Sequence, residues 1–154
     1  MTIEHDIEVL EQVAILRRLG TGALRILAIG AESQSVGPGE VLFTAGEPAD
    51  GAFVVQRGSF TLTPERAGSE EVIAGPGTLL GESALLAETK RPATATARED
   101  STVMRISRAM FLKMLEGYPE AARRLHEVIA ARADAWGREI ENVRAVLAPG
   151  TKPR

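Results

Sequence analysis

The hydrophobic residues near the N-terminus recur at helical spacing. From Ile7 to Leu19 they lie three or four positions apart, which is the period of a helix with one buried face. The residues on this face are Ile7, Leu10, Val13, Ala14 and Leu16. Thr21 is a suitable N-cap for a second helix, which we expect to end in the polar run 32–35. The pattern therefore predicts an N-terminal helical segment over residues 1–32.

The pattern changes to short apolar runs over residues 33–107, where most of the glycines and prolines lie. The runs rich in β-branched or aromatic residues are Val41–Phe43, 53–55, 59–63, 71–73, Ala93–Ala97 and 102–106. Many short strands separated by turn residues predict an antiparallel sandwich or barrel. Residues 81–87 differ, because their composition favours a helix, so we expect one or two helical turns among the strands.

Helical spacing returns over residues 108–147. Ser107 is a suitable cap for a first helix, and a longer pattern without internal proline runs from Pro119 to Leu147. The residues that repeat every seven positions are Ile129, Trp136 and Val143, and, offset by four, Ala133, Ile140 and Leu147. Such a seam over about three heptads predicts pairing of two copies through this helix. Residues 148–154 form a tail.

Composition excludes several classes of function. The chain has 154 residues, enough for one globular unit with a helical appendage, since domains usually contain about 100–150 residues. Its 18 Lys and Arg residues against 21 Asp and Glu give a net charge of -3, so nonspecific nucleic-acid binding is not indicated. There is no cysteine, which excludes disulfides, thiolate metal sites and a cysteine nucleophile.

The N-terminal segment and the two histidines indicate a soluble cytoplasmic protein without a metal site. The first 18 residues contain neither a basic region nor a long apolar core, so we expect no signal peptide and no membrane span. His5 and His126 have no second ligand at metal-binding spacing, so no metal site is expected. No acid and base pair can be assembled from the sequence, which argues against an enzyme.

Residues 80–97 carry the most specific chemistry. Gly81 begins the short helical run, Glu82 places a carboxylate beside it, and Arg91 directly precedes a strand. Backbone N–H groups at a helix start and the fork of an arginine both favour phosphate oxygens. A carboxylate would repel phosphate, so Glu82 is better suited to accept hydrogen bonds from sugar hydroxyls. Phosphate and ribose together indicate a nucleotide.

This segment resembles the phosphate-binding cassette of cyclic nucleotide-binding domains, as found in catabolite activator proteins, protein kinase regulatory subunits and cyclic-nucleotide-gated channels. The stretch 41–58 is similar to the first two hairpins of that family. The resemblance implies an eight-stranded jelly-roll β-barrel, mainly β with flanking helices. The N-terminal helices, an embedded cassette helix and a long C-terminal helix would surround it.

The resemblance also implies roles for individual residues. Glu82, with the backbone of Gly81, would hold the ribose 2′-hydroxyl, and Arg91 would pair with the cyclic phosphate. Backbone N–H groups would complete the anion cradle at Ser83, Ala84 and Ala93. Candidates for the walls or cover of the base pocket are Val54, Val72, Leu79, Leu80 and Trp136, with residues 123–128 as an alternative cover.

Two positions depart from the family pattern. Pro92 stands where a small residue with a hydroxyl is common, and proline has no backbone N–H. The missing hydroxyl argues against the guanine preference associated with threonine at this position, and therefore favours cyclic AMP over cyclic GMP. Ala52 is small where the strand usually carries a larger apolar residue.

The expected function is a non-enzymatic regulatory sensor. Binding of a cyclic nucleotide would reposition the C-terminal helix of a homodimer, joined from Pro119 to Leu147, and so signal to an effector protein. One alternative is a fragment or relative of a Crp/Fnr-type transcription regulator without its DNA-binding domain. Because the sequence ends shortly after Leu147, we expect no DNA binding by this chain. The other alternative is a structural partner domain with a vestigial pocket.

Overall fold

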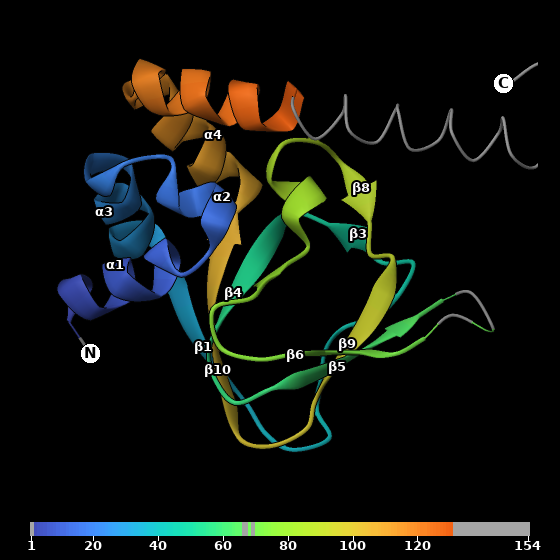
Figure 1. Cartoon of the computed structure of the whole chain (residues 1–154). Helices are drawn as coiled ribbons and strands as arrows, with labels where there is room; N and C mark the ends of the chain where they lie inside the picture. Colours follow the sequence, from blue (N-terminus) through green and yellow to red (C-terminus); the bar gives the residue numbers. More distant parts are fainter. Residues whose placement is uncertain (1, 66–67, 69, 131–154) are drawn as a thin grey trace, which may run out of the picture.

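The helices gather on one side of a roll of antiparallel strands (Figure 1). The computed structural model describes residues 2–65, 68 and 70–130. The helices are α1 (Ile3–Glu11), α2 (Ala14–Arg17), α3 (Thr21–Gly30), the 3-10 helix η1 (Glu82–Leu85) and α4 (Arg108–Gly117). A further helix covers residues 119–130. The short helix η1 contacts both the roll and α4, so it lies where the two parts meet.

The strands form two four-stranded sheets and one small pair. They are β1 (Glu32–Val36), β2 (Val41–Phe43), β3 (Pro48–Ala49), β4 (Gly51–Arg57), β5 (Phe60–Pro64), β6 (Val72–Ala74), β7 (Leu79–Leu80), β8 (Thr89–Lys90), β9 (Ala93–Ala97) and β10 (Ser101–Ser107). One sheet has the order β1-β10-β4-β7, the other β2-β9-β5-β6, and β3 pairs with β8. The predicted class, a jelly roll with flanking helices, is confirmed, although the two sheets do not close into a barrel.

The alternation of side chains along β4 divides the core in two. Phe53 and Val55 face the inside of the roll, in a cluster with Phe43, Phe60 and Leu80. The intervening residues of β4 face the opposite way and pack against the helices. Members of this helix-side cluster include Ala52, Val54, Leu85, Met104, Ile106 and Phe111. Successive strand residues point to opposite faces, so the central strand β4 supports both clusters.

The prediction of a single helix between Ile7 and Leu19 is wrong. The chain forms α1 and α2 instead, with an extended backbone at Val13 between them. Val13, Ile15 and Leu16 are all buried, and one continuous helix would spread these three side chains over too wide an arc for one buried face. The break reorients α2 so that each of them reaches the helix-side cluster.

The structure also differs from the sequence reading at the next two boundaries. Gly20, with a φ of 92°, caps α3, and Thr21 is its first helical residue rather than its cap. The polar run 32–35 belongs to the edge strand β1, which pairs with β10. An edge strand is held by backbone hydrogen bonds on one side, so its exposed polar side chains do not prevent pairing.

The C-terminal elements begin where the sequence predicts. The Ser107 hydroxyl accepts a hydrogen bond from the backbone N–H of Met110 at 3.2 Å, and α4 ends at Gly117. The following helix begins at Pro119. Of the heptad seam, only Ile129 lies within the described residues, so the predicted dimer contact is outside them. In the described ranges, no helix is long and apolar enough to cross a membrane.

The tight pairing of β4 with β10 makes Gly51 a sensitive position. A Cβ added there would overlap the carbonyl of Ile106, whereas a Cβ at Gly75 would meet nothing within 4 Å. We expect Gly51→Ala to lower the free energy of unfolding by about 2 kcal/mol or more, measured by urea-induced unfolding. The matched control Gly75→Ala should stay within about 0.5 kcal/mol of the parent. Equal stability of the two variants would show that the backbone of β10 does not approach Gly51 closely.

Candidate functional site

The cassette begins with a glycine that no other residue replaces without strain. Gly81 has a φ of 79°, in the left-handed region, and it directly precedes η1. Its carbonyl accepts a hydrogen bond from the N–H of Ala84 at 3.1 Å. The Ser83 carbonyl accepts from the N–H groups of Leu86 and Ala87, both at 3.4 Å. These bonds hold residues 81–87, which we call the cassette from here on, as a single tight turn of helix between β7 and β8.

The backbone of Arg91 is fixed to the first hairpin. Its N–H donates to the carbonyl of Glu47 at 2.8 Å, and its own carbonyl accepts from the N–H of Gly46 at 2.8 Å. The side chain enters the roll, where the residue is 5% exposed. Its guanidinium carbon lies 4.4 Å from the ring centroid of Phe43 and 5.5 Å from that of Phe53. The arginine is therefore held by cation–π contact as well as by its backbone.

The guanidinium of Arg91 is a buried charge that lacks part of its hydrogen bonding. Its Nη1 has no hydrogen-bond partner in the described part of the chain. Burial lowers the pKa of Arg91, while the nearby charges of Asp50 and Glu47 act in the opposite direction. An arginine stays protonated in proteins, so the unsatisfied donor carries positive charge. Such a group favours an anionic partner with oxygen acceptors.

Gly81 and Arg91 are brought together by the fold. A Cβ added to Gly81 would overlap Nη1 of Arg91, so the guanidinium lies directly against the start of the cassette. Two features that favour phosphate oxygens, the donor of Arg91 and the backbone at the start of η1, are thus adjacent.

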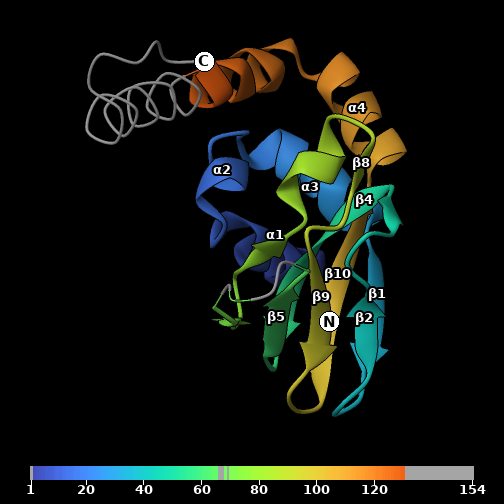
Figure 2. The same ribbon diagram turned by 90° about the vertical axis from the view of Figure 1, so that its right-hand side faces the viewer.

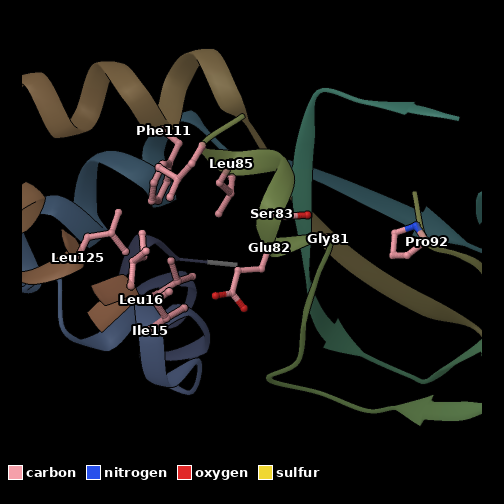
Figure 3. A pocket seen from close by; sticks show the side chains of 11 residues that line it. Ile15, Leu16, Gly81, Glu82, Ser83, Leu85, Pro92, Phe111 and Leu125 are labelled. Carbon is pink, nitrogen blue, oxygen red and sulfur yellow. The ribbon is translucent and has the colours of Figure 1, made fainter. Parts of the chain in front are cut away.

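The residues of the cassette also line a mostly apolar cavity of about 570 Å³ on the helix side (Figure 3). Glu82 is half-buried, and its carboxylate points from the cassette toward Ile15 and Leu16 of α2. Ser83 and Pro92 are exposed at the cavity lining. Its apolar wall is completed by Leu85, Leu86, Phe111, Leu125 and Ile129.

Two of the residues predicted to form the anion cradle, Ala84 and Ala93, already take part in secondary structure. Ala84 is fully buried, and its N–H already donates to Gly81. Ala93 is half-buried at the start of β9, opposite Pro64 of β5. A ligand contact at Ala84 would therefore require its hydrogen bond to be shared or exchanged.

The candidates for the base pocket do not lie together. Leu80 is buried inside the roll, whereas Val54 and Leu79 pack on the helix-side cluster, on the other face of the sheet. Val72, near the edge of the second sheet, is 56% exposed. Trp136 lies outside the described residues. Contact of the base with these residues stays a prediction, and the placement of Val54, Leu79 and Val72 gives it no support.

The polar residues of this site lie within a stretch that matches a known domain family. A family model described as the cyclic nucleotide-binding domain matches residues 33–118, more than half of the chain. The chain belongs to this family. The match includes the whole cassette and Arg91, together with the strands that surround them. Both stretches that carry the sequence resemblance, 41–58 and 80–97, lie within the matched residues.

Individual proteins of known sequence or structure are also similar to this chain. A structure titled as a cyclic nucleotide-binding-like protein from Brucella abortus is 38% identical, with a TM-score of 0.63, over 72% of this chain and 97% of that one. An uncharacterized NTE family protein of Mycobacterium tuberculosis is 34% identical over 71% of this chain and 19% of its own length. The Cyclic AMP receptor protein of Thermus thermophilus is 31% identical, over 61% and 45% respectively. The chain thus matches less than half the length of these two curated relatives.

Several residues of this cyclic nucleotide-binding domain were missed by sequence reasoning as parts of the site. Phe43 and Phe53 were recognised only as strand residues, and Leu16 only as part of one helix face. Ile15 was not singled out at all, because it falls off the helical spacing of that face. The alternation along their strands indicates that both phenylalanines face inward, but it does not reveal that the guanidinium of Arg91 contacts both rings. Among the described residues there is no cluster of side chains that could hold a metal ion.

The contact between Gly81 and Arg91 can be tested apart from backbone strain. Gly81 and Gly39 have nearly the same φ, 79° and 81°, but a Cβ at Gly39 would meet nothing within 4 Å. We expect Gly39→Ala to lose about 1–2 kcal/mol of stability from strain alone, and Gly81→Ala to lose more. Thermal and urea unfolding measure both losses.

A double mutant supplies the control for this test. In an Arg91→Ala background the overlap is removed, so Gly81→Ala should cost no more than Gly39→Ala does. If the cost of Gly81→Ala is the same in both backgrounds, the guanidinium does not lie against the cassette.

Proposed function

We propose that this domain is a regulatory sensor that binds a cyclic nucleotide at the cassette and performs no catalytic step. The observation that supports this most directly is the buried, unsatisfied Nη1 of Arg91 beside Gly81. A cyclic phosphate carries one negative charge and exposes two oxygens, so one guanidinium with adjacent backbone N–H groups matches it in charge and in acceptors. Membership of the family supports the same ligand class.

Glu82 is proposed as the residue that recognises the sugar. As a carboxylate it accepts hydrogen bonds from ribose hydroxyls, and it follows Gly81 directly, next to the proposed phosphate position. Its carboxylate points into the helix-side cavity in the structure, so contact with a ribose would include a change of its side-chain rotamer. Ser83 would donate a hydrogen bond from its backbone N–H to the cyclic phosphate.

Cyclic AMP is proposed as the preferred ligand. Pro92 provides neither a hydroxyl nor a backbone N–H, so a guanine base would lack a side-chain partner at this position. One of the relatives bears the name Cyclic AMP receptor protein, which supports the same choice.

The output is proposed to pass through the C-terminal helices. The cavity beside the cassette is lined by Leu85 of η1, Phe111 of α4 and Leu125 of the helix that follows. A movement of the cassette would change these apolar contacts. A nucleotide shifts the helices only to the extent that it binds one arrangement more tightly than the other.

Isothermal titration with cyclic AMP and cyclic GMP tests the ligand. Saturable binding of cyclic AMP is expected, tighter than that of cyclic GMP. Because Arg91 would provide the charged donor, Arg91→Ala should weaken binding at least tenfold, which corresponds to about 1.4 kcal/mol.

Lys90→Ala is the matched control for this titration. Lys90 is the neighbouring cation, but it is exposed on β8, so its loss removes the same charge and should leave the affinity nearly unchanged. A cooperative unfolding transition of Arg91→Ala, monitored by circular dichroism, establishes that the variant is folded. Equal affinity of Arg91→Ala and the parent contradicts the proposal, and absence of binding by the parent favours a domain with a vestigial pocket.

The homodimer is proposed from the heptad seam between Pro119 and Leu147. Sedimentation velocity at micromolar concentration should give the mass of a dimer. Ile140→Glu places a charge on the seam and should produce a monomer, because a buried unpaired carboxylate is costly. Ala145→Glu adds the same charge off the seam and should remain dimeric. A monomeric parent protein would contradict the proposed dimer.

A further inference from the structure

The end of the cassette is held by an arginine that belongs to another element. Nη1 of Arg108, the first residue of α4, donates to the carbonyl oxygens of Ala84 at 3.2 Å and Ala87 at 3.0 Å. Both carbonyls belong to the C-terminal end of the cassette. The same nitrogen donates to the carbonyl of Ala49 in β3 at 3.0 Å. One cationic nitrogen thus connects three segments of the chain.

The attachment of Arg108 to the roll is reinforced by its backbone. Its N–H donates to the carbonyl of Asp50 at 2.7 Å. The carboxylate of Asp50 forms an ion pair with Arg105 of β10 at 2.8 Å. The junction of β3 and β4 is therefore bound by the end of β10 and the start of α4, which makes it a fixed reference for the cassette.

Carbonyl groups at the end of a short helix would otherwise need other partners. In η1 and the residues after it, the carbonyls of Ala84 and Ala87 point toward the start of α4, and Arg108 satisfies both. Figure 2 shows the cassette and β8 beneath α4, and η1 contacts α4 directly. A cassette that moves away from the start of α4 must either break these bonds or pull on Arg108, the first residue of α4.

We propose that Arg108 is the positioning residue that couples the cassette to α4. It does not touch the proposed nucleotide position, and it acts by tying the end of the cassette to the start of the helix. This role rests on the proposed function, since it concerns the output of the same site, but the attachment itself exists without ligand. The attachment of the cassette to α4 and the transmission of ligand binding to α4 are therefore tested by two separate measurements.

Hydrogen exchange of the ligand-free chain tests the attachment. The N–H groups of Leu86 and Ala87 are bonded to Ser83, so their exchange reports opening of the cassette. Arg108→Met removes the charge and the donors and should raise exchange across residues 83–90 at least tenfold, with β5 and β9 unchanged. Arg105→Met is the matched control, because Arg105 binds Asp50 but forms no bond to the cassette.

The conservative variant separates this attachment from general packing. All three carbonyls bond to a single nitrogen, and an ammonium group offers three donors, so Arg108→Lys should restore most of the protection. Unchanged cassette exchange in Arg108→Met, or an equal increase in Arg105→Met, would overturn the assignment. Either result holds whether or not the chain binds a nucleotide.

Exchange with saturating cyclic AMP tests the transmission. In the parent, the ligand should alter exchange over residues 108–130, and in Arg108→Met this change should shrink at least threefold. The affinity of Arg108→Met should be retained or raised, because the cassette then moves without α4. An undiminished change in Arg108→Met, or an affinity reduced more than tenfold, counts against transmission through Arg108. If the parent binds no cyclic nucleotide, the proposed function fails while the ligand-free result still decides the attachment.

Discussion

A guanidinium loses its hydration when it is buried, and Arg91 is only 5% exposed. The rings of Phe43 and Phe53 offset part of this loss by cation–π attraction, and Asp50 and Glu47 add favourable charge. Nη1 still lacks a hydrogen-bond partner in the described chain. The close approach of Gly81 to this group is possible because glycine has no side chain. The buried charge therefore accounts for a glycine at position 81, and its unpartnered donor favours an anionic partner.

The cassette also lies between two separate cores. Leu80, just before Gly81, belongs to the interior of the roll, whereas Ala84 and Leu85 are buried on the helix side. A shift of the Arg91 guanidinium therefore acts on the cassette, which is packed against the helices. Arg108 adds a polar link to this apolar contact. The arrangement allows a small shift near the proposed phosphate position to reach α4, because packed interfaces do not deform continuously.

Much of the roll could be predicted because its strands leave a signal in the sequence. Strands such as Ala93–Ala97 are flanked by turn residues and match the structure at both ends. The strand Glu32–Val36 was missed because its side chains are polar and mostly exposed, and its pairing uses only the backbone. Strands of two residues, such as β3, β7 and β8, are too short to show an alternation of buried and exposed side chains, so the sequence does not predict them. The break at Val13 depends on burial against other elements, which local spacing does not contain.

The sequence by itself determined the features that depend on neighbouring residues. These are the helix cap at Ser107 and the order of glycine, carboxylate and arginine in the cassette, since capping and turn chemistry act over a few positions. Only the tertiary structure decided that Arg91 contacts the rings of both Phe43 and Phe53, and that Val54 faces the helices. Both depend on which strands pair and in which register, and a shift of one residue would turn every side chain to the opposite face. Register is settled by burial summed over the whole sheet, and no short segment of the sequence contains that sum.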